Sequence, residues 1–424
     1  TDNTHTNASV NFSSTNDNIS TFFNNNKSDI TILPGFISKS ESGEITTLGS
    51  GGSDYSAAII ASAINAEELQ IWTDVSGMFT TNPKLVKQAK PITKLSYQEA
   101  VELSHFGAKV LYPPTVQPVL DKNIPILIKN TLLPEDSGTL ISNENGNGKN
   151  LAVKGISNID DIALLTLQGN GMVGVPGFSK RLFETLSLEK INIILITQAS
   201  SEHSICIGIL ESDADHAKKV INKTFENEIS LHKIDPVVIE KELAIIAVVG
   251  DNMRNHQGIS GKMFSALGKN NVNIRAIAQG ASERNISAVI SKNDVKKALN
   301  TLHERFFEIK TKPINLFITG VGNVGERLIN QIKQQEDYVK EHLKLNLRII
   351  GLSNSRTMAF DEDGISLNDW KNQISNGEKA SPEAFLNKVK ELNLRNSVFV
   401  DVTASKDIAN LYADYLRESI AVVA

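Results

Sequence analysis

An internal repeat constrains the fold of this 424-residue chain more than any other feature of its sequence. Residues Gly177 to Glu202 recur at Gly258 to Glu283, with a constant offset of 81 and no gap. Each copy begins with glycine and predicts an amphipathic helix followed by two strands joined by a turn. A unit of this size cannot bury both faces of its own sheet, so the two copies are expected to pair.

Strands and helices are expected to alternate on both sides of the repeat. The glycine-rich turn Gly49 to Gly52 leads into a small-residue helix and then a strand, which indicates an α/β layer. After Pro313, three strands alternate with helices and predict a parallel, doubly wound sheet. The predicted elements are the helix 54–65 and the strands 68–73, 314–319, 347–352 and 398–402.

The remaining segments are predicted from their composition. Residues 1–29 are rich in Asn, Ser and Thr and resemble a disordered tail, whereas Ile30 to Leu33 predicts a short buried strand that ends at Pro34-Gly35. Asn143 to Asn150 has no apolar residue, and it is either an exposed connection between domains or a long surface loop.

Bulk properties exclude several classes of protein. The net charge of -5 argues against a nucleic-acid partner, which usually requires a basic protein. No apolar run approaches the ~18 residues of a membrane span. The single cysteine, Cys206, fits a reducing compartment, so we expect a cytoplasmic protein that contacts neither membrane nor nucleic acid.

The glycine-rich turn suits an anion, because glycine lets backbone N–H groups approach a phosphate or carboxylate at a helix N-terminus. A plain tight turn explains it equally well. The segments that accompany it are Pro34-Gly35-Phe36, Trp72-Thr73-Asp74-Val75-Ser76-Gly77 and Phe106-Gly107-Ala108-Lys109-Val110-Leu111. At this spacing they resemble the nucleotide-binding half of aspartokinases, and the likeness extends over residues 1–140.

This resemblance implies roles for individual residues. Asp54 would be catalytic and organise phosphoryl transfer, and Ser53 would contact the substrate L-aspartate. The residues implied around ATP with Mg²⁺ are Thr73, Asp74, Gly77, Phe79, Lys84 and Lys109. A cation such as Lys109 beside the phosphates offsets the charge that develops during transfer. No residue is assigned as a direct metal ligand.

Three positions depart from the aspartokinase pattern. Ser50 stands where the family has an arginine, and serine cannot make a bidentate, charged contact with the substrate carboxylate. Phe79 replaces a tyrosine and Lys84 an arginine. The Lys-Phe-Gly-Gly start of the kinase is also absent from this sequence. We therefore expect that this polypeptide does not phosphorylate aspartate.

The repeat resembles the tandem ACT domains of aspartokinases, which are βαββαβ modules that bind amino acids, over residues 160–310. A free amino acid needs donors for its carboxylate and acceptors for its ammonium group, and Asn and Gln side chains offer both. The same side chains could instead cap turns. The resemblance implies threonine as an effector that shifts a population of conformations, and a homo-oligomer formed through these domains. The implied effector residues are Asn192, Ile193, Gln198, Asn273, Ile274 and Gln279.

The sequence Gly320-Val321-Gly322-Asn323-Val324-Gly325 follows an apolar strand and opens a helix, which is the context of a dinucleotide-binding fingerprint. The next strand ends without an acidic residue, and Arg356 follows it. This arginine favours the 2′-phosphate of NADP(H), or it is a solvated surface charge. Further cofactor contacts are expected from Asn354, Thr403 and Ser405.

These motifs resemble the N-terminal part of homoserine dehydrogenase, over residues 313–424. This sequence stops where the family continues into an Asn-Lys motif, whose lysine takes part in catalysis. We therefore expect no hydride transfer from this polypeptide and only weak binding of NADP(H).

The expected architecture is α/β and α+β multidomain. The expected domains are a partial amino-acid-kinase domain at 1–142, tandem ACT domains at 151–311 and a partial Rossmann domain at 313–424. A parent enzyme of this kind would phosphorylate L-aspartate with ATP and reduce aspartate semialdehyde to homoserine with NADPH, under control of threonine. The alternative is a module without turnover that binds an amino acid and forms oligomers.

Overall fold

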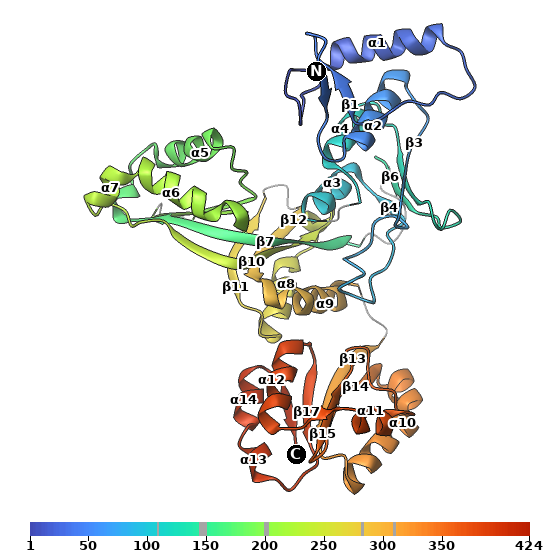
Figure 1. The fold of residues 1–424 in the computed structure, drawn as a ribbon, viewed down its shortest axis with the longest axis vertical. Coiled ribbons are helices and arrows are strands. Elements are labelled where there is room, and N and C mark those ends of the chain that lie inside the picture. The colour runs from blue at the N-terminus through green and yellow to red at the C-terminus, as the bar shows by residue number, and fades with distance from the viewer. Residues whose placement is uncertain (108–109, 144–150, 199–202, 281–283, 308–310) are drawn as a thin grey trace. The chain divides into compact units, whose positions relative to one another are not determined.

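The computed structural model describes residues 1–107, 110–143, 151–198, 203–280, 284–307 and 311–424 (Figure 1). These residues form two compact units. The first unit comprises Thr1–Ile259 and Ile274–Lys292, and the second comprises Ser260–Asn273 and Asn293–Ala424.

A four-stranded mixed sheet organises the N-terminal segment of the first unit. Its elements are β3 (Leu69–Thr73), β4 (Lys94–Leu95), β5 (Ile126–Asn130), β6 (Thr139–Ile141), α2 (Gly52–Ile64), α3 (Tyr97–His105) and α4 (Val116–Leu120). The strand order is β3-β5-β6-β4, with β3 and β5 parallel. Successive strand residues point to opposite faces, and Ile126 and Ile128 of β5 are fully buried. The predicted helix 54–65 and strand 68–73 are thus confirmed as α2 and β3.

The prediction of disorder for residues 1–29 is wrong, because α1 (Phe12–Asn25) forms a helix there. The Asn11 side chain caps it by accepting the Ser14 N–H at 3.3 Å. The helix packs on α2, where the Phe12 ring lies 6.5 Å from the ring of Tyr55. Packing of a few apolar side chains therefore stabilises a helix here, although the segment is polar on average.

The predicted buried strand 30–33 is also wrong. Ile30 and Ile32 are 80% and 91% exposed, and neither lies in a strand. Pro34, which follows, has no N–H to donate to a ladder. The strands that form here are instead β1 (Ile37–Lys39) and β2 (Ile45–Thr47), which pair as an antiparallel hairpin.

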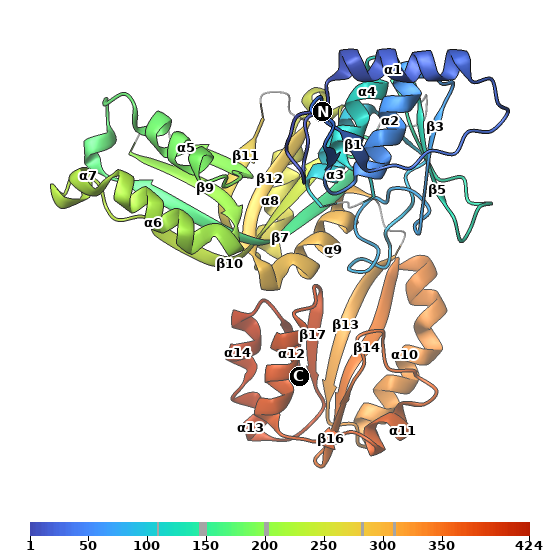
Figure 2. The same cartoon turned by 45° about the horizontal axis from the view of Figure 1, so that its top comes forward.

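Both copies of the repeat contribute to one antiparallel sheet, which confirms that they pair (Figure 2). Its strands are β7 (Gly155–Gln168), β8 (Leu195–Gln198), β9 (Ser204–Leu210), β10 (Val238–Val249), β11 (Ile274–Gln279) and β12 (Asn285–Ser291). The order is β11-β12-β10-β7-β9-β8, so the two long strands β7 and β10 lie side by side at the centre.

Each copy completes its part of the sheet by pairing with one half of the other copy's long strand. The first half of β7 pairs with residues 243–249 of β10, whereas its second half pairs with β9 and with residues 238–240 of β10. The exchange occurs at an irregularity where Asp161 and Glu242 have φ of +58° and +57°. These two residues are 81 positions apart, so the bend is itself part of the repeat.

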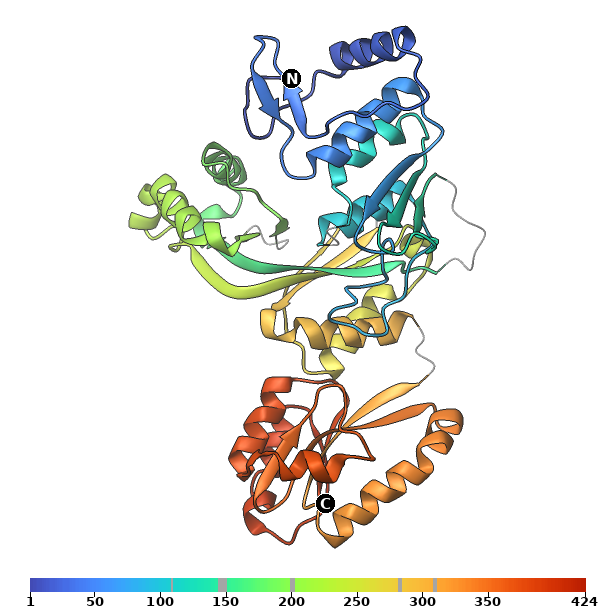
Figure 3. The ribbon, with the colours of Figure 1, turned by 45° about the vertical axis from the view of Figure 1, so that its right-hand side comes forward.

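Two helices of the first copy, α5 (Phe178–Leu188) and α6 (Ala214–Thr224), cover one face of its strands (Figure 3). Leu182 and Leu186 of α5 pack with Ile207 of β9 in a buried apolar cluster. The short α7 (Glu226–Ser230) continues from α6, and Phe225 between them stacks on Phe178 at 5.6 Å. In the second copy, α8 (Ile259–Lys269) and α9 (Val295–Phe306) begin 81 positions after α5 and α6.

The second unit contains a six-stranded sheet with the order β16-β15-β14-β13-β17-β18. The strands are β13 (Lys312–Thr319), β14 (Leu345–Ser353), β15 (Thr357–Phe360), β16 (Glu378–Lys379), β17 (Ser397–Asp401) and β18 (Ala421–Val423). Strands β14, β13, β17 and β18 are parallel, and β15 and β16 form an antiparallel edge. The three strands predicted in this region are confirmed as β13, β14 and β17.

Apolar clusters lie on both faces of this sheet, as a doubly wound fold requires. Its helices are α10 (Asn323–His342), α11 (Trp370–Ser375), α12 (Pro382–Leu392), α13 (Lys406–Ala409) and α14 (Tyr412–Arg417). Ile329 of α10 packs with Ile318 on one face, and Phe385 of α12 packs with Phe317 on the other. In the described parts of the chain, none of the helices combines the length and apolar content that crossing a bilayer requires.

Candidate functional site

The first candidate site lies where α2 begins. Gly51 is the N-cap residue at φ +76°, and an added Cβ there would lie 2.4 Å from Cγ of Tyr112. Ser53 is exposed in the first turn, and burial raises the pKa of the Asp54 carboxyl. Ser50, in the turn before the helix, is also exposed and offers one hydroxyl without charge. The turn can hold a small anion through backbone groups, but Ser50 supplies no cation to fix a carboxylate.

The residues assigned to ATP begin at the end of β3, a strand against which α2 packs. Thr73 donates its hydroxyl hydrogen bond to Asp74 over 3.2 Å. Gly77 has φ +94°, and an added Cβ would lie 2.3 Å from Oγ1 of Thr139. Close packing alone therefore requires glycine at position 77, whether or not a nucleotide binds.

Two further assigned residues lie in the loops after β3. Phe79 is half-buried, Lys84 is exposed, and Lys109 lies outside the described residues. Lys129 of the neighbouring strand β5 has its ammonium 5.8 Å from the ring centroid of Trp72, and it donates to the Asp136 carbonyl.

The second candidate site is a cavity of about 340 Å³ in the first copy of the repeat. It is lined by Met172, by residues 174–179 of the turn that starts α5, and by Gln198 and Ile205. Gly177 is the N-cap residue of α5 at φ +105°, so the first backbone N–H groups of the helix face this turn. The turn provides donors for a carboxylate, and Gln198 provides both a donor and an acceptor.

The other assigned residues of the first copy lie elsewhere. Asn192 is exposed and Ile193 half-buried in the connection between α5 and β8, and neither is part of the cavity lining. The turn residues 172–179 were not predicted as effector contacts from sequence, although Gly174-Val175-Pro176-Gly177 is a turn signal.

The second copy repeats the position of the glutamine. Gln279 ends β11 opposite Ile286, as Gln198 ends β8 opposite Ile205. Gln279 and Asn273 are exposed, and Ile274 is half-buried.

The third candidate site lies at the carboxyl ends of β13, β14 and β17. Gly320 has φ +98°, and an added Cβ there would lie 2.7 Å from the Val402 carbonyl oxygen. A Cβ on Gly325 would lie 2.4 Å from the Gly320 oxygen, whereas one on Gly322 would meet no atom within 4 Å. The first and third glycines are thus needed for packing, and the second leaves open space beside the N-terminus of α10. This division of roles fits a bound pyrophosphate.

A cavity of about 330 Å³ adjoins these glycines. Of the assigned residues, Gly320, Asn354, Thr403 and Ser405 line it. The remaining assigned residues, Val321, Gly322, Asn323, Val324, Gly325 and Arg356, are not in its lining. Further lining residues that sequence reasoning missed are Ser353, Ser355, Ser381, Pro382 and Tyr415.

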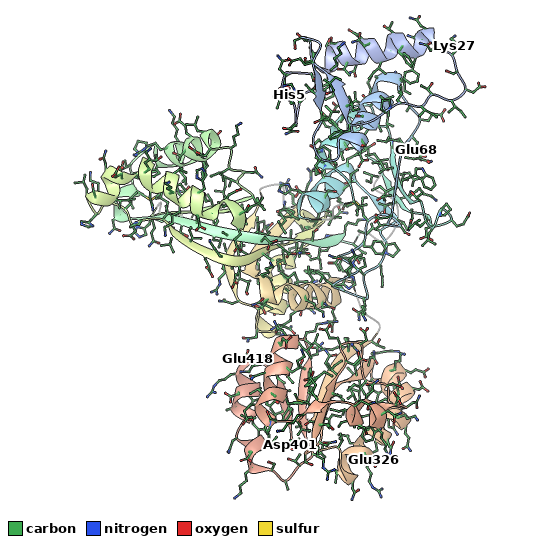
Figure 4. The ribbon with its side chains drawn as sticks, viewed as in Figure 1. His5, Lys27, Glu68, Glu326, Asp401 and Glu418 are labelled. Carbon is green, nitrogen blue, oxygen red and sulfur yellow. The ribbon has the colours of Figure 1, made fainter. Side chains whose placement is uncertain are left out.

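The loops around this cavity are held by one amide side chain, that of Asn354, and one carboxylate side chain, that of Asp401. Asn354 accepts the backbone N–H groups of Arg356 and Thr357 at 2.7 and 2.8 Å, and Arg356 itself is exposed. Asp401, labelled in Figure 4, accepts the Thr403 N–H at 2.8 Å and the Tyr412 hydroxyl. This second bond raises the pKa of Tyr412 to about 12.

Comparisons with known proteins match each region of the chain to a protein family. Residues 3–130 match the amino acid kinase family, residues 165–225 and 246–306 each match an ACT domain, and residues 320–424 match the homoserine dehydrogenase NAD-binding domain. The expected multidomain fold class is therefore confirmed.

A bifunctional aspartokinase/homoserine dehydrogenase of Haemophilus influenzae is 42% identical over 398 residues, which are 94% of this chain and 48% of that protein. A chloroplastic enzyme of the same name from Arabidopsis thaliana is 40% identical over 95% of this chain and 45% of its own length. Among solved structures, Escherichia coli aspartokinase III in complex with aspartate and ADP (R-state) has a TM-score of 0.61 at 29% identity. That match covers 73% of this chain and 68% of the other.

The chain spans about half the length of the curated relatives it matches. The kinase family and the nicotinamide-binding domain imply ATP and a nicotinamide cofactor, respectively. The match runs through all three regions in one order, and the chain belongs to the bifunctional aspartokinase/homoserine dehydrogenase family.

Proposed function

We propose that this chain is the threonine-sensing core of a bifunctional enzyme of the aspartate pathway. The parent protein phosphorylates L-aspartate with Mg²⁺-ATP and reduces aspartate semialdehyde to homoserine with NADPH. The names of the relatives support these two reactions. Threonine binds to the repeat and biases both enzymes through a shift between conformations.

The cavity beside Gln198 is the observation that carries the sensing role. Its volume of about 340 Å³ accommodates a small amino acid. The glycine-rich turn before α5 presents backbone N–H groups to a carboxylate, and the Gln198 amide oxygen can accept from an ammonium group. Gln279 supplies the same group in the second copy, 81 positions later.

Isothermal titration calorimetry with threonine tests this role. We expect Gln198→Ala to weaken binding about tenfold or more, because a hydrogen bond to a charged group contributes about 1.5–3 kcal/mol. Gln279→Ala is expected to remove the second binding event in the same way. Gln335→Ala, at an exposed position of α10 in the other unit, is the matched control and should bind as the wild type does.

Equal heats in the wild type and both glutamine variants would exclude these residues from the effector site. Lysine and methionine, titrated in parallel, define the specificity. Sedimentation equilibrium at the same concentrations measures the oligomeric state. We propose that the repeat forms a homo-oligomer, supported by the exposed apolar side chains of Ile196 and Ile277, which are 51% and 43% exposed.

We propose that this chain alone does not phosphorylate aspartate. Ser50 lacks the charged fork that a substrate carboxylate requires, and Gly51 beside it has no side chain that could replace it. A coupled ADP-release assay is expected to give no aspartate-dependent rate above background for the wild type. Turnover that depends on aspartate and disappears in Asp54→Ala would contradict the proposal.

For the dinucleotide site, we propose a preference for NADP(H) over NAD(H). The residues present fit a dinucleotide, since the space beside Gly322 is open and a cavity adjoins Gly320. Bound NADPH supplies the hydride in the parent enzyme. The chain's own groups would hold it. The N-terminus of α10 would bind the pyrophosphate, and Arg356, which follows β14, would bind the 2′-phosphate.

A further inference from the structure

The turn that follows β10 in the second copy is hydrogen-bonded to the start of α3, a helix of the kinase segment. Ser96 caps α3 and accepts the Glu99 N–H at 3.0 Å, while Glu99 accepts the Ser96 N–H at 3.0 Å. Asp251 joins this capping box from the repeat. Its N–H donates to Glu99 over 3.1 Å, and its carboxylate accepts the Ser96 hydroxyl. Arg284 lies 3.2 Å from the other oxygen of Asp251.

The same helix contacts the repeat further along its length. Asn285, at the start of β12, donates to the Glu102 carboxylate over 2.7 Å, and Ser157 of β7 donates to the Leu103 carbonyl over 3.2 Å. An added Cβ on Gly107, just beyond the helix, would lie 2.0 Å from the Asn158 carbonyl oxygen. Contacts thus run from the cap of α3 to the residues that follow it.

Apolar packing accompanies these hydrogen bonds. Tyr97, Ala100 and Leu103 are at most 1% exposed and share one cluster with Ile245 and Val249 of β10. Glu99 is itself only 3% exposed, and burial raises the pKa of its carboxyl. A buried carboxylate is costly to leave without donors, so α3 is held where the Asp251 turn supplies one.

The first copy repeats one backbone hydrogen bond of this turn but has different side chains there. Gly169 donates to the His203 carbonyl at 3.0 Å, as Gly250 donates to the Arg284 carbonyl at 3.0 Å. With the offset of 81, the position of Asp251 is occupied by Asn170 in the first copy. There the turn after β7 borders the open cavity of Gln198. The turn of the first copy is thus bonded within its own copy, where Gly171 donates to the Lys233 carbonyl at 2.8 Å, whereas the turn of the second copy is bonded to the kinase segment.

We propose that the second copy of the sensor is the docking element for the kinase, in which Asp251 positions α3 through Ser96 and Glu99. The helix leads directly into Phe106 and Gly107, the described part of a segment expected at ATP. A change in the second copy is thereby transmitted to the nucleotide side of the kinase. The coupling to threonine rests on the proposed sensing function, whereas the positioning of α3 does not.

Hydrogen exchange measured by mass spectrometry on the full chain tests the positioning role without any ligand. Asp251→Ala is expected to raise exchange of the α3 amides about tenfold, because a charge-assisted bond that holds the helix start is lost. Asn170→Ala, the matched change in the first copy, should leave α3 unchanged. Asp251→Asn retains an acceptor for Ser96 and should restore most of the protection. Ser96→Asp keeps an acceptor for the cap of α3 but loses the hydroxyl donor to Asp251, and it should reproduce the effect of Asp251→Ala.

The two variants decide the outcome together. Unchanged α3 exchange in both Asp251→Ala and Ser96→Asp overturns the proposal. If Asp251→Ala accelerates exchange throughout the chain, Ser96→Asp decides. A change confined to α3 then supports the proposal, and wild-type exchange there overturns it.

Threonine provides a second measurement. Its result would not change if the contact between Asp251 and α3 were merely structural. In the wild type, saturating threonine should change α3 exchange. In Asp251→Ala, the heat of threonine binding should stay within about twofold of the wild type while the response of α3 is lost. A response that persists overturns the coupling. If the wild type gives no threonine heat, the sensing function fails, and the ligand-free comparison still decides the positioning of α3.

Discussion

Alanine at position 322 is expected to remove most dinucleotide binding without unfolding the domain. Gly322 has φ −84°, which any residue adopts, and an added Cβ would meet no atom within 4 Å. The methyl group would instead occupy the space through which the pyrophosphate reaches the backbone of α10. Loss of these charge-assisted bonds costs about 3 kcal/mol, or roughly a hundredfold in affinity. Fluorescence titration with NADPH, and with NADH in parallel, measures the change.

Gly320→Ala provides the contrast for this prediction. At φ +98°, with the Val402 carbonyl 2.7 Å from an added Cβ, this substitution strains the turn itself and should lower the melting temperature as well. Loss of binding with an unchanged melting temperature is expected only for Gly322→Ala. If that folded variant bound NADPH as the wild type does, the pyrophosphate would have to lie elsewhere.

Separating the two copies of the repeat is expected to unfold both. If the chain is produced as residues 1–235 and 236–424, the first piece has β7 without β10 and the second has β10 without β7. The pairing lost includes fully buried positions such as Ile162 and Ile245, and each large apolar side chain contributes about 1.5–3 kcal/mol on burial. Mixing the pieces should restore a folded 1:1 complex, as followed by NMR spectra of the backbone amides and by gel filtration.

Ile245→Lys in the second piece is the matched control for this experiment. Ile245 is fully buried opposite Ile159, so a lysine there should prevent the pieces from associating. Protected β7 amides in the isolated first piece would show that the first copy completes its sheet alone, and would contradict the shared arrangement.

Much of this fold could be predicted because the same local sequence pattern occurs twice and predicts the same helix and strands in both copies. The two copies start their helices at Phe178 and Ile259, 81 positions apart as the sequence indicates. The fingerprint at Gly320 was likewise predicted, since strand, turn and helix are all contiguous in sequence. Local periodicity reports such features because their contacts lie within a few residues.

Other features depend on contacts that no local pattern contains. The helix α1 was missed because composition averages conceal its few packed side chains, such as Phe12 against Tyr55. The capping box of Ser96 and Glu99 is visible in sequence, but its partner Asp251 lies more than 150 positions away. No local pattern indicates that the halves of β7 and β10 pair across the two copies.

The exchange of strand halves at Asp161 and Glu242 has a consequence for inheritance. Because each duplicate completes its sheet with residues encoded in the other, neither can be deleted, swapped for a homologue or allowed to decay by itself. Both are expected to melt in a single transition. A harmful substitution in one copy therefore destabilises both copies. Selection acts on the duplicated pair as a single unit.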